Sequence, residues 1–462
     1  MNPKELKITW IDSRNDDIQI KLNELRKRLS PQGNVVSQKG KQRTIDIFGA
    51  PLTPQEVVEL ICREVAQKGM PALLDYCRRI DQAELTPETI RVSEKELKQA
   101  HKNVSPAYLQ TIRNIRNNIV DFQTAIRHQD IRLERPNGWL AERYRPMRRI
   151  GICVPGGAAA YPSTVLMTAV PAQVAGVPEI AIMVPPTQFG AYNDNLLAAC
   201  YELGIHEIYR MGGAQGVAAF AFGIPGDRPE VEIKRVDKIV GPGNLFVALA
   251  KKRVYGEVDI DSIAGPSEVV VIVDESTRAD FTAYDMMAQA EHSPGASILI
   301  GWNEAAIRNT IFEIERHLST VERGELTRQS LEEFGAVILA QNEDEACRLT
   351  NWIAPEHLHI ATQNAEFLAN KILCAGAIFL GNYTPVALGD YAAGPSHVLP
   401  TSGTARFASG LTCNDFLRAN SLLSFNQNGL EQFADDINCL ATIEGLTAHR
   451  ESVNIRRPDS FE

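Results

Sequence analysis

The chain has little of what marks a secreted, membrane-bound or disulfide-rich protein. Its eight cysteines in 462 residues are far apart and never form a Cys-x-x-Cys pair, which argues against a zinc ribbon or disulfide framework and favours reduced, mostly buried thiols. No window approaches about 18 uncharged apolar residues, so no membrane span is expected. The opening stretch, MNPKELKITWIDSRNDDIQ, alternates charges and does not resemble a secretory signal peptide. The cysteines are Cys62, Cys77, Cys153, Cys200, Cys347, Cys374, Cys413 and Cys439.

Basic residues are also outnumbered by acidic ones. The chain has 47 Lys and Arg against 57 Asp and Glu, a net charge of −10 and a pI near 5.5. An acidic chain is a poor candidate for binding phosphate backbones, so we expect no nucleic-acid partner. With 44% hydrophobic and 23% charged residues, the composition is that of a soluble cytoplasmic protein with a large core.

Short β-rich runs alternate with helix-length segments from Arg148 onward, which predicts an α/β fold with parallel strands covered by helices. The segment DIDSIAGPSE, residues 259–268, interrupts this alternation and separates two modules of about four strands each. The expected strands are 148–155, 179–186, 206–211, 237–241, 267–274, 297–302, 335–340 and 376–381.

The two ends of the chain follow other patterns. Residues 1–50 are polar and predict an extended arm or a loosely packed start, whereas capped helices are expected from Thr53 to His128. After Gly381 the alternation fades into loops and helices. We therefore divide the chain into an N-terminal arm and helical region, two α/β modules, and a C-terminal loop and helix region. Their bounds are 1–140, 141–262, 263–382 and 383–462.

Three glycine-rich segments, CVPGGAAAYPS, MGGAQG and VGPGN, directly follow expected strands. Ligands bind at the carboxyl ends of parallel strands, so these segments indicate a ligand site on the first module. None of them reads GxGxxG, and glycines are common in strand-to-helix turns for structural reasons. On composition alone, a dinucleotide site and plain turns explain these segments equally well.

A carboxylate and an imidazole stand side by side in NWIAPEHLHI, as Glu356 and His357. Neighbouring side chains point to opposite faces of a strand. We therefore expect a loop behind Pro355, whose irregular backbone turns both side chains into one pocket. A solvated turn with two polar residues is the simpler alternative. His359, inside the apolar run that follows, is expected to be packed.

Other polar residues suggest a metal site. Gln289 and His292 are three positions apart at the end of an expected helix, so an oxygen and a nitrogen donor can face the same way. A helix C-terminus with a histidine answering the dipole is the alternative. Asp390 and His397 lie in the loop GDYAAGPSH, which could equally be a connector.

Near the C-terminus, Glu444 and His449 lie on or beside an expected helix. A surface helix of mixed charge is the plain alternative. We assign no role to the remaining histidines, which are His101, His128, His206 and His317.

Eight segments together resemble the histidinol dehydrogenase family, in order and at matching intervals, from about Thr53 to His449. They are VPGGAAAYPSTVLM, GGAQGVAAFAFG, VDKIVGPGN, DSIAGPSEVVVIVD, AQAEHSP, APEHL, GDYAAGPSHVLPT and LTAHR. The resemblance implies oxidation of L-histidinol through the aldehyde to L-histidine, the last steps of histidine biosynthesis. Two NAD⁺ and one Zn²⁺ per active site are implied. It also implies two incomplete Rossmann-like domains in an intertwined homodimer.

The resemblance also assigns roles to residues. It implies zinc ligands at Gln289, His292, Asp390 and His449, the last from the partner subunit. Substrate contacts are implied at Ser267, His397 and Glu444, with His357 and the zinc ligands close by. NAD contacts are implied at Gln215 and Asn244. Cys153 stands where the family commonly has tyrosine, which leaves a smaller side chain near the cofactor.

The pair Glu356 and His357 fits two catalytic tasks. An imidazole suits proton removal from an alcohol near neutral pH, and a carboxylate in a dry pocket can act as a base for water. An NAD- and zinc-dependent dehydrogenase of the same family, acting on another small amino- or hydroxy-alcohol, is the alternative. A non-catalytic paralogue is disfavoured, because every expected ligand and base is present.

Overall fold

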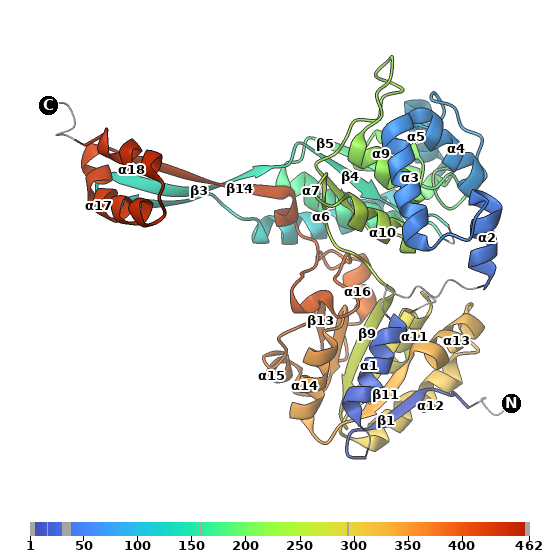
Figure 1. Ribbon diagram of the computed structural model, residues 1–462. Helices are drawn as coiled ribbons and strands as arrows, with labels where there is room; N and C mark the ends of the chain where they lie inside the picture. Colours follow the sequence, from blue (N-terminus) through green and yellow to red (C-terminus); the bar gives the residue numbers. More distant parts are fainter. Residues whose placement is uncertain (1–4, 16, 30–37, 158, 293–294, 458–462) are drawn as a thin grey trace.

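The computed structural model describes residues 5–15, 17–29, 38–157, 159–292 and 295–457 (Figure 1). They form a mixed α/β structure with two parallel sheets, which confirms the expected fold class. A third, antiparallel sheet of three strands projects from the two as a ribbon. Of the eight cysteines, all of which are free, six are buried, as expected of reduced thiols.

The first sheet has five parallel strands in the order β6-β5-β4-β7-β8. Helices α3 and α4 pack against α9 and α10 beside it, and α3 begins with the expected capping box at Thr53. The strands are β4 (Arg149–Cys153), β5 (Glu179–Val184), β6 (Glu207–Arg210), β7 (Lys238–Val240) and β8 (Asp259–Ile260). The helices are α3 (Pro54–Lys68), α4 (Met70–Asp81), α7 (Pro162–Ala175), α8 (Asp194–Glu202), α9 (Gly213–Phe222) and α10 (Leu245–Val254).

The second sheet has six parallel strands in the order β1-β11-β10-β9-β12-β13. Its central strands are apolar and buried, as expected of a sheet covered on both faces. The strands are β1 (Thr9–Asp12), β9 (Ser267–Val273), β10 (Gly295–Gly301), β11 (Ala336–Leu339), β12 (His357–Ala361) and β13 (Ala377–Leu380). The helices are α11 (Ala279–Ala290), α12 (Glu304–His317), α13 (Gly324–Phe334), α14 (Glu343–Ile353) and α15 (Ala365–Ala369).

The expectation of about four strands in each module was wrong, because β1, β8 and β12 had been missed. The two histidines of β12, His357 and His359, made this buried strand look too polar to predict. In the structure both rings have hydrogen-bond partners. His359, 1% exposed, is packed as expected, with Nε2 donating to the Gly381 carbonyl oxygen at 2.8 Å. The first 50 residues are not merely an arm. Ile11 of β1 and Leu22 of α1 are each 1% exposed, and β1 pairs with β11.

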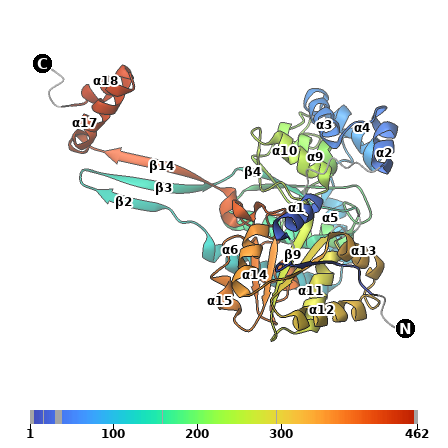
Figure 2. The same cartoon turned by 60° about the horizontal axis from the view of Figure 1, so that its bottom comes forward.

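The sequence predicted only loops and helices in the C-terminal region, but the structure also has a long strand there. Strand β14 (Leu417–Phe425) pairs antiparallel with β3 (Gly138–Pro146) along its whole length, and β2 (Ile131–Arg135) pairs with the other edge of β3. Helices α17 (Gln427–Ile443) and α18 (Thr447–Asn454) lie at the far end of this ribbon, away from both parallel sheets (Figures 1 and 2).

The remaining helices connect these parts. α6 packs on α7, and α16 follows β13. Among the described residues, no helix has both the length and the apolar composition needed to span a bilayer. The connecting helices are α1 (Ile18–Leu29), α2 (Gln38–Phe48), α5 (Glu94–Asn103), α6 (Pro106–Ile126) and α16 (Val386–Tyr391).

Candidate active site

Polar side chains gather at the amino ends of two adjacent strands of the six-stranded sheet. Ser267 is the first residue of β9 and His357 the first residue of β12, and the two strands are hydrogen-bonded neighbours. This position differs from the usual ligand site of parallel sheets, which lies at the carboxyl ends of the strands. The glycine-rich segments of the first sheet, by contrast, do follow carboxyl ends.

Glu356 is a buried carboxyl group, 6% exposed. Its Oε2 accepts a 2.5 Å hydrogen bond from Ser267 Oγ and a 2.9 Å bond from the Glu268 N–H. Burial raises the pKa of Glu356, and these bonds and the neighbouring His357 oppose the rise without cancelling it. The carboxyl group is therefore fixed in place and has the raised pKa expected of it.

His357 is also buried, at 3% exposed. Its Nδ1–H donates to the Glu268 carbonyl oxygen and its Nε2–H to Asp390 Oδ1, both at 3.2 Å. Burial disfavours the charged ring, but Glu356 and Asp390 outweigh it and raise the pKa of His357 to about 9. The ring is thus more basic than the near-neutral imidazole assumed from sequence.

The expected loop around this pair is only half right, because His357 already belongs to β12. Glu356 lies between that strand and the end of α14, where Ala354 has a left-handed φ of 52°. This turn redirects the backbone before Pro355. As a result Oε2 of Glu356 lies 3.6 Å from Nδ1 of His357.

Asp390 and His397 extend the cluster. Asp390 lies on α16, and its carbonyl oxygen accepts a 2.9 Å hydrogen bond from His397 Nδ1. Burial acts to raise the pKa of Asp390, but the hydrogen bond and charge of His357 outweigh it and lower that pKa. Burial lowers the pKa of His397. An ionised carboxylate therefore stands beside two imidazoles.

Gln289 and His292 lie beside this cluster. Gln289 is 3% exposed in the last turn of α11, and its Nε2 has no hydrogen-bond partner. His292 comes after the helix, which ends at Ala290 rather than at 292, and its side chain is exposed. Partial burial lowers the pKa of His292, the nearby charge of Asp390 opposes this effect, and the charge of His357 adds to it.

These donors are suited to a metal but do not complete a site. Gln289, His292 and Asp390 offer an amide, an imidazole and a carboxylate, and the orphaned Gln289 amide is an unmet polar group of the kind a ligand satisfies. Within the described part of the chain, no three His, Cys, Asp or Glu side chains are placed to hold a metal ion. A zinc ion there requires at least one further ligand.

Glu444 and His449 do not reach this cluster within one chain. Glu444 ends α17 and His449 lies in α18, and both side chains are exposed. Figure 1 places both helices at the tip of the ribbon, far from α11 and α16.

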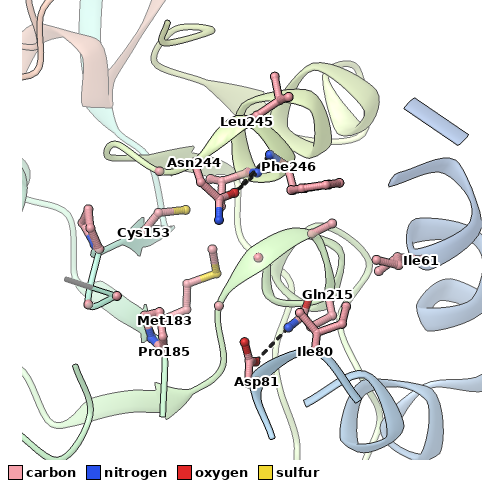
Figure 3. Close-up of a pocket in the computed structure, with 18 of the residues that line it drawn as sticks. Ile61, Ile80, Asp81, Cys153, Met183, Pro185, Gln215, Asn244, Leu245 and Phe246 are labelled. Atoms are coloured by element: carbon pink, nitrogen blue, oxygen red, sulfur yellow. Dashed lines mark hydrogen bonds between the residues drawn. The ribbon is translucent and has the colours of Figure 1, made fainter. Parts of the chain in front are cut away.

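A separate cavity of about 690 Å³ lies at the carboxyl ends of the first sheet, against α2, α3 and α4. Gln215, 1% exposed, donates from Nε2 to Asp81 Oδ2 at 3.0 Å (Figure 3). Asn244 caps α10, and its Oδ1 accepts from the N–H groups of Phe246 and Val247 at 3.0 and 3.2 Å. The N-termini of α9 and α10 thus border this cavity, an arrangement that favours an anionic group.

Cys153 lines the same cavity at the end of β4. Burial raises the pKa of its thiol to about 12, so the group stays protonated at neutral pH. Apolar side chains of α2, α3 and α4 line another part of the wall, among them Phe48, Ile61 and Ile80.

Two contacts of these sites had no indication in the sequence. Asp81, the partner of Gln215, ends α4 in an ordinary amphipathic stretch, and Glu268 stands in the quoted GPSE motif without an assigned role. The sequence also contains no indication of a buried ion pair between Lys251 and Asp261. Lys251 Nζ donates a further hydrogen bond to the Gly241 carbonyl oxygen at 3.0 Å. The ion pair fixes the turn that leads to Asn244.

Residues 52–457 match the histidinol dehydrogenase family model. The chain belongs to the histidinol dehydrogenase family. It is 55% identical over 456 residues to the histidinol dehydrogenase of Rhodopirellula baltica, covering 98% of both chains, and 43% identical over 419 residues to that of Heliobacterium mobile, covering 90% and 96%. The crystal structure of histidinol dehydrogenase from Elizabethkingia anophelis superposes with a TM-score of 0.86 at 32% identity, covering 98% of both chains.

Membership of the histidinol dehydrogenase family confirms the resemblance of the eight sequence motifs. It makes the chain an oxidoreductase of histidine biosynthesis with a small-molecule substrate. The shared fold extends over nearly the whole chain, whereas the family model begins at residue 52.

Proposed function

We propose that the protein oxidises L-histidinol through L-histidinaldehyde to L-histidine, using two NAD⁺ and one Zn²⁺ per active site. The observation that carries this proposal is the pair Glu356 and His357. Two buried groups that can take protons lie 3.6 Å apart, each with its own hydrogen-bond partners. A four-electron oxidation removes protons from two different oxygens and has use for both.

His357 is the proposed base for the alcohol. Oxidising an alcohol requires a base for the hydroxyl proton and an acceptor for the hydride. Nε2 is the ring nitrogen proposed to serve, because Nδ1 is held by the Glu268 carbonyl oxygen whereas Nε2 faces the side chain of Asp390. His357 becomes a base once Asp390 no longer accepts the hydrogen bond from Nε2.

Glu356 is the proposed base for water. The aldehyde must add water to give a gem-diol before a second hydride can leave. A carboxylate with a raised pKa is a stronger base than an exposed one, and burial supplies that rise. The hydrogen bonds from Ser267 and Glu268 orient Oε2 and leave the other oxygen, Oε1, for water.

The proposed zinc ligands are Gln289, His292 and Asp390 of one subunit and His449 of the partner subunit. When bound, the ion would coordinate the imidazole and amine of histidinol and would balance the negative charge of Asp390. The proposed substrate contacts are Ser267, His357 and His397 of one subunit and Glu444 of the partner subunit. The buried, unsatisfied Gln289 amide and the exposed His292 support this set.

The 690 Å³ cavity of the first sheet is the proposed NAD site. Two helix N-termini suit the pyrophosphate, and the apolar wall suits the adenine ring. Gln215 and Asn244 are the proposed cofactor contacts. Cys153 leaves more room beside the cofactor than a tyrosine would.

The ribbon is the proposed subunit contact of an intertwined homodimer. The ribbon and α17 at its tip carry exposed apolar side chains, and monomeric proteins rarely expose large surfaces of this kind. These side chains include Ile131, Leu133 and Leu423 of the ribbon and Leu440 and Ile443 of α17. A cytoplasmic location, and the division at 140, 262 and 382, remain part of the proposal.

A substrate panel separates this function from the alternative, a zinc- and NAD-dependent dehydrogenase for another small alcohol. NADH formation is measured with L-histidinol, with simple amino-alcohols and with simple diols. We expect kcat/KM for L-histidinol to exceed the others by orders of magnitude. A higher value for any other alcohol would favour the alternative.

A further inference from the structure

Glu268 is a buried carboxyl group behind the two proposed bases, and the chemistry above does not use its side chain. It is the second residue of β9 and 2% exposed. Burial raises the pKa of Glu268 to about 8, and the nearby Glu356 carboxyl adds to the rise. A carboxyl group is costly in such a place, and its Oε1 has no hydrogen-bond partner. Its presence there calls for a function.

The backbone of Glu268 contacts both proposed bases. Its N–H donates to Glu356 Oε2 at 2.9 Å, and its carbonyl oxygen accepts from His357 Nδ1 at 3.2 Å. The place of this one residue therefore fixes the orientation of both side chains. In particular, with Nδ1 held in this way, Nε2 of His357 faces Asp390.

The side chain of Glu268 faces backbone N–H groups of two chain segments, the turn at residues 402–403 and the residue before β12. Those of Gly403, Glu356 and Ser402 all act on its carboxyl and lower its pKa against the effect of burial. Ser402 and Gly403 have left-handed φ angles of 57° and 74°. Consecutive N–H groups in such a turn form a concave site for an oxygen acceptor, which the carboxyl group of Glu268 supplies.

The turn of Ser402 is itself unusual, since residues other than glycine rarely adopt a positive φ, and such conformations cluster at active sites and ligand-binding segments. The same turn is tied to the start of β9 on its other side. Thr401 Oγ1 accepts a 2.6 Å hydrogen bond from the Gly265 N–H, two residues before Ser267. Three chain segments thus meet around one carboxyl group.

We propose that Glu268 is a positioning residue for the two bases, a proposal that rests on the function assigned to Glu356 and His357. Its carboxyl group joins the Ser402–Gly403 turn to the Glu356 backbone, so that the first residues of β9 and β12 keep one relative position. Glu268 touches no reacting atom. It acts by holding Oε2 of Glu356 and Nδ1 of His357.

The test compares Glu268→Gln with wild type. The amide keeps the size but brings N–H groups toward the N–H groups of Ser402 and Gly403. We expect kcat to fall about 10- to 100-fold, the usual range for residues that orient active groups, while KM for histidinol and NAD⁺ stays within about threefold. Ser402→Gly keeps the N–H and removes the unusual serine conformation, so its kcat should match wild type.

Glu345→Gln is the matched control. Glu345 is another buried carboxyl group, in the first turn of α14, and its Oε2 accepts from Ser13 Oγ and the Gln341 N–H, both at 2.7 Å. These partners follow the carboxyl ends of β1 and β11, at the opposite edge from the bases. The control should lower Tm without lowering kcat.

Wild-type kcat in Glu268→Gln overturns the proposal, as does a joint change of kcat, KM and Tm. If Glu268→Gln does not fold, Glu268→Asp decides by the same criteria, because it keeps the carboxyl group and shortens its reach. A crystal structure of the folded variant separates this proposal from the assigned function. Displaced Glu356 or His357 side chains support positioning whatever the substrate is, and unmoved ones reject it.

Discussion

Ser267 Oγ lies 2.5 Å from Glu356 Oε2, although the two residues are 89 positions apart in the sequence. The contact is possible because β9 and β12 are neighbours in the sheet and both begin at this edge. It places a hydroxyl donor on the carboxyl group that we propose as the base for water. The protonation of that base therefore depends on Ser267.

Replacing Ser267 should shift the pH dependence of aldehyde oxidation. The hydrogen bond from Ser267 lowers the pKa of Glu356 against the effect of burial, so its loss in Ser267→Ala should raise that pKa. The base must be ionised to act, so the acidic limb of the kcat/KM profile should move to higher pH. Ser276→Ala, which removes another serine-to-carboxylate hydrogen bond, to Asp274, should leave the limb in place. A limb that moves to lower pH would contradict this role.

Removing His292 should remove zinc. In His292→Ala, the proposed metal site loses one of three donors from its own chain, so we expect metal content and turnover to fall together and added Zn²⁺ to restore little. Metal content by mass spectrometry and NADH formation are the measurements. His206→Ala, a change to an exposed histidine paired with Glu94, is the control and should keep both. Normal metal content and turnover in His292→Ala would refute the zinc assignment.

Asn244 should affect both stability and cofactor binding. Asn244→Ala removes the cap of α10 and should lower the free energy of unfolding by about 1 kcal/mol. Asn244→Ser keeps a capping oxygen and should retain most of the stability. If Asn244 also contacts NAD⁺, both variants should show a raised KM for NAD⁺. A wild-type KM in Asn244→Ser would leave the residue with only its capping function.

Two inactive variants should restore each other. His292→Ala and His449→Ala change proposed ligands that meet only across the dimer. A mixed dimer then has one site with both changes and one site intact. With random exchange, activity should recover to about one quarter of wild type, since half the dimers are mixed. No recovery after verified mixing would place His449 in its own subunit's site or outside the site.

Sequence reasoning worked where residues carry strong periodicity or turn chemistry. Four of the five strands of the first sheet followed from apolar runs, and the capped start of α3 followed from TPQE. It failed where pairing is remote. Nothing in TWID predicts that β1 joins β11, more than 300 residues later, and the mixed polarity of LRANSLLSF hides the strand β14.

For the site, the sequence supplied residue types but not their arrangement. Family motifs pointed to Glu356, His357, Asp390 and His397, and the structure brings them together. The hydrogen bond of Ser267 to Glu356 depends on strand order, which no local pattern encodes. Glu268 was overlooked because a lone glutamate in a strand is usually solvated, and only burial reveals its role.

The account is tested most directly by counting NADH. Purified protein loaded with Zn²⁺ is given a limiting, known amount of L-histidinol with excess NAD⁺, and the reaction is followed to completion. Two NADH for each histidinol, with L-histidine as the product, is the predicted result, because Glu356 and His357 each serve one oxidation. One NADH for each histidinol, with the aldehyde as the product, would contradict it.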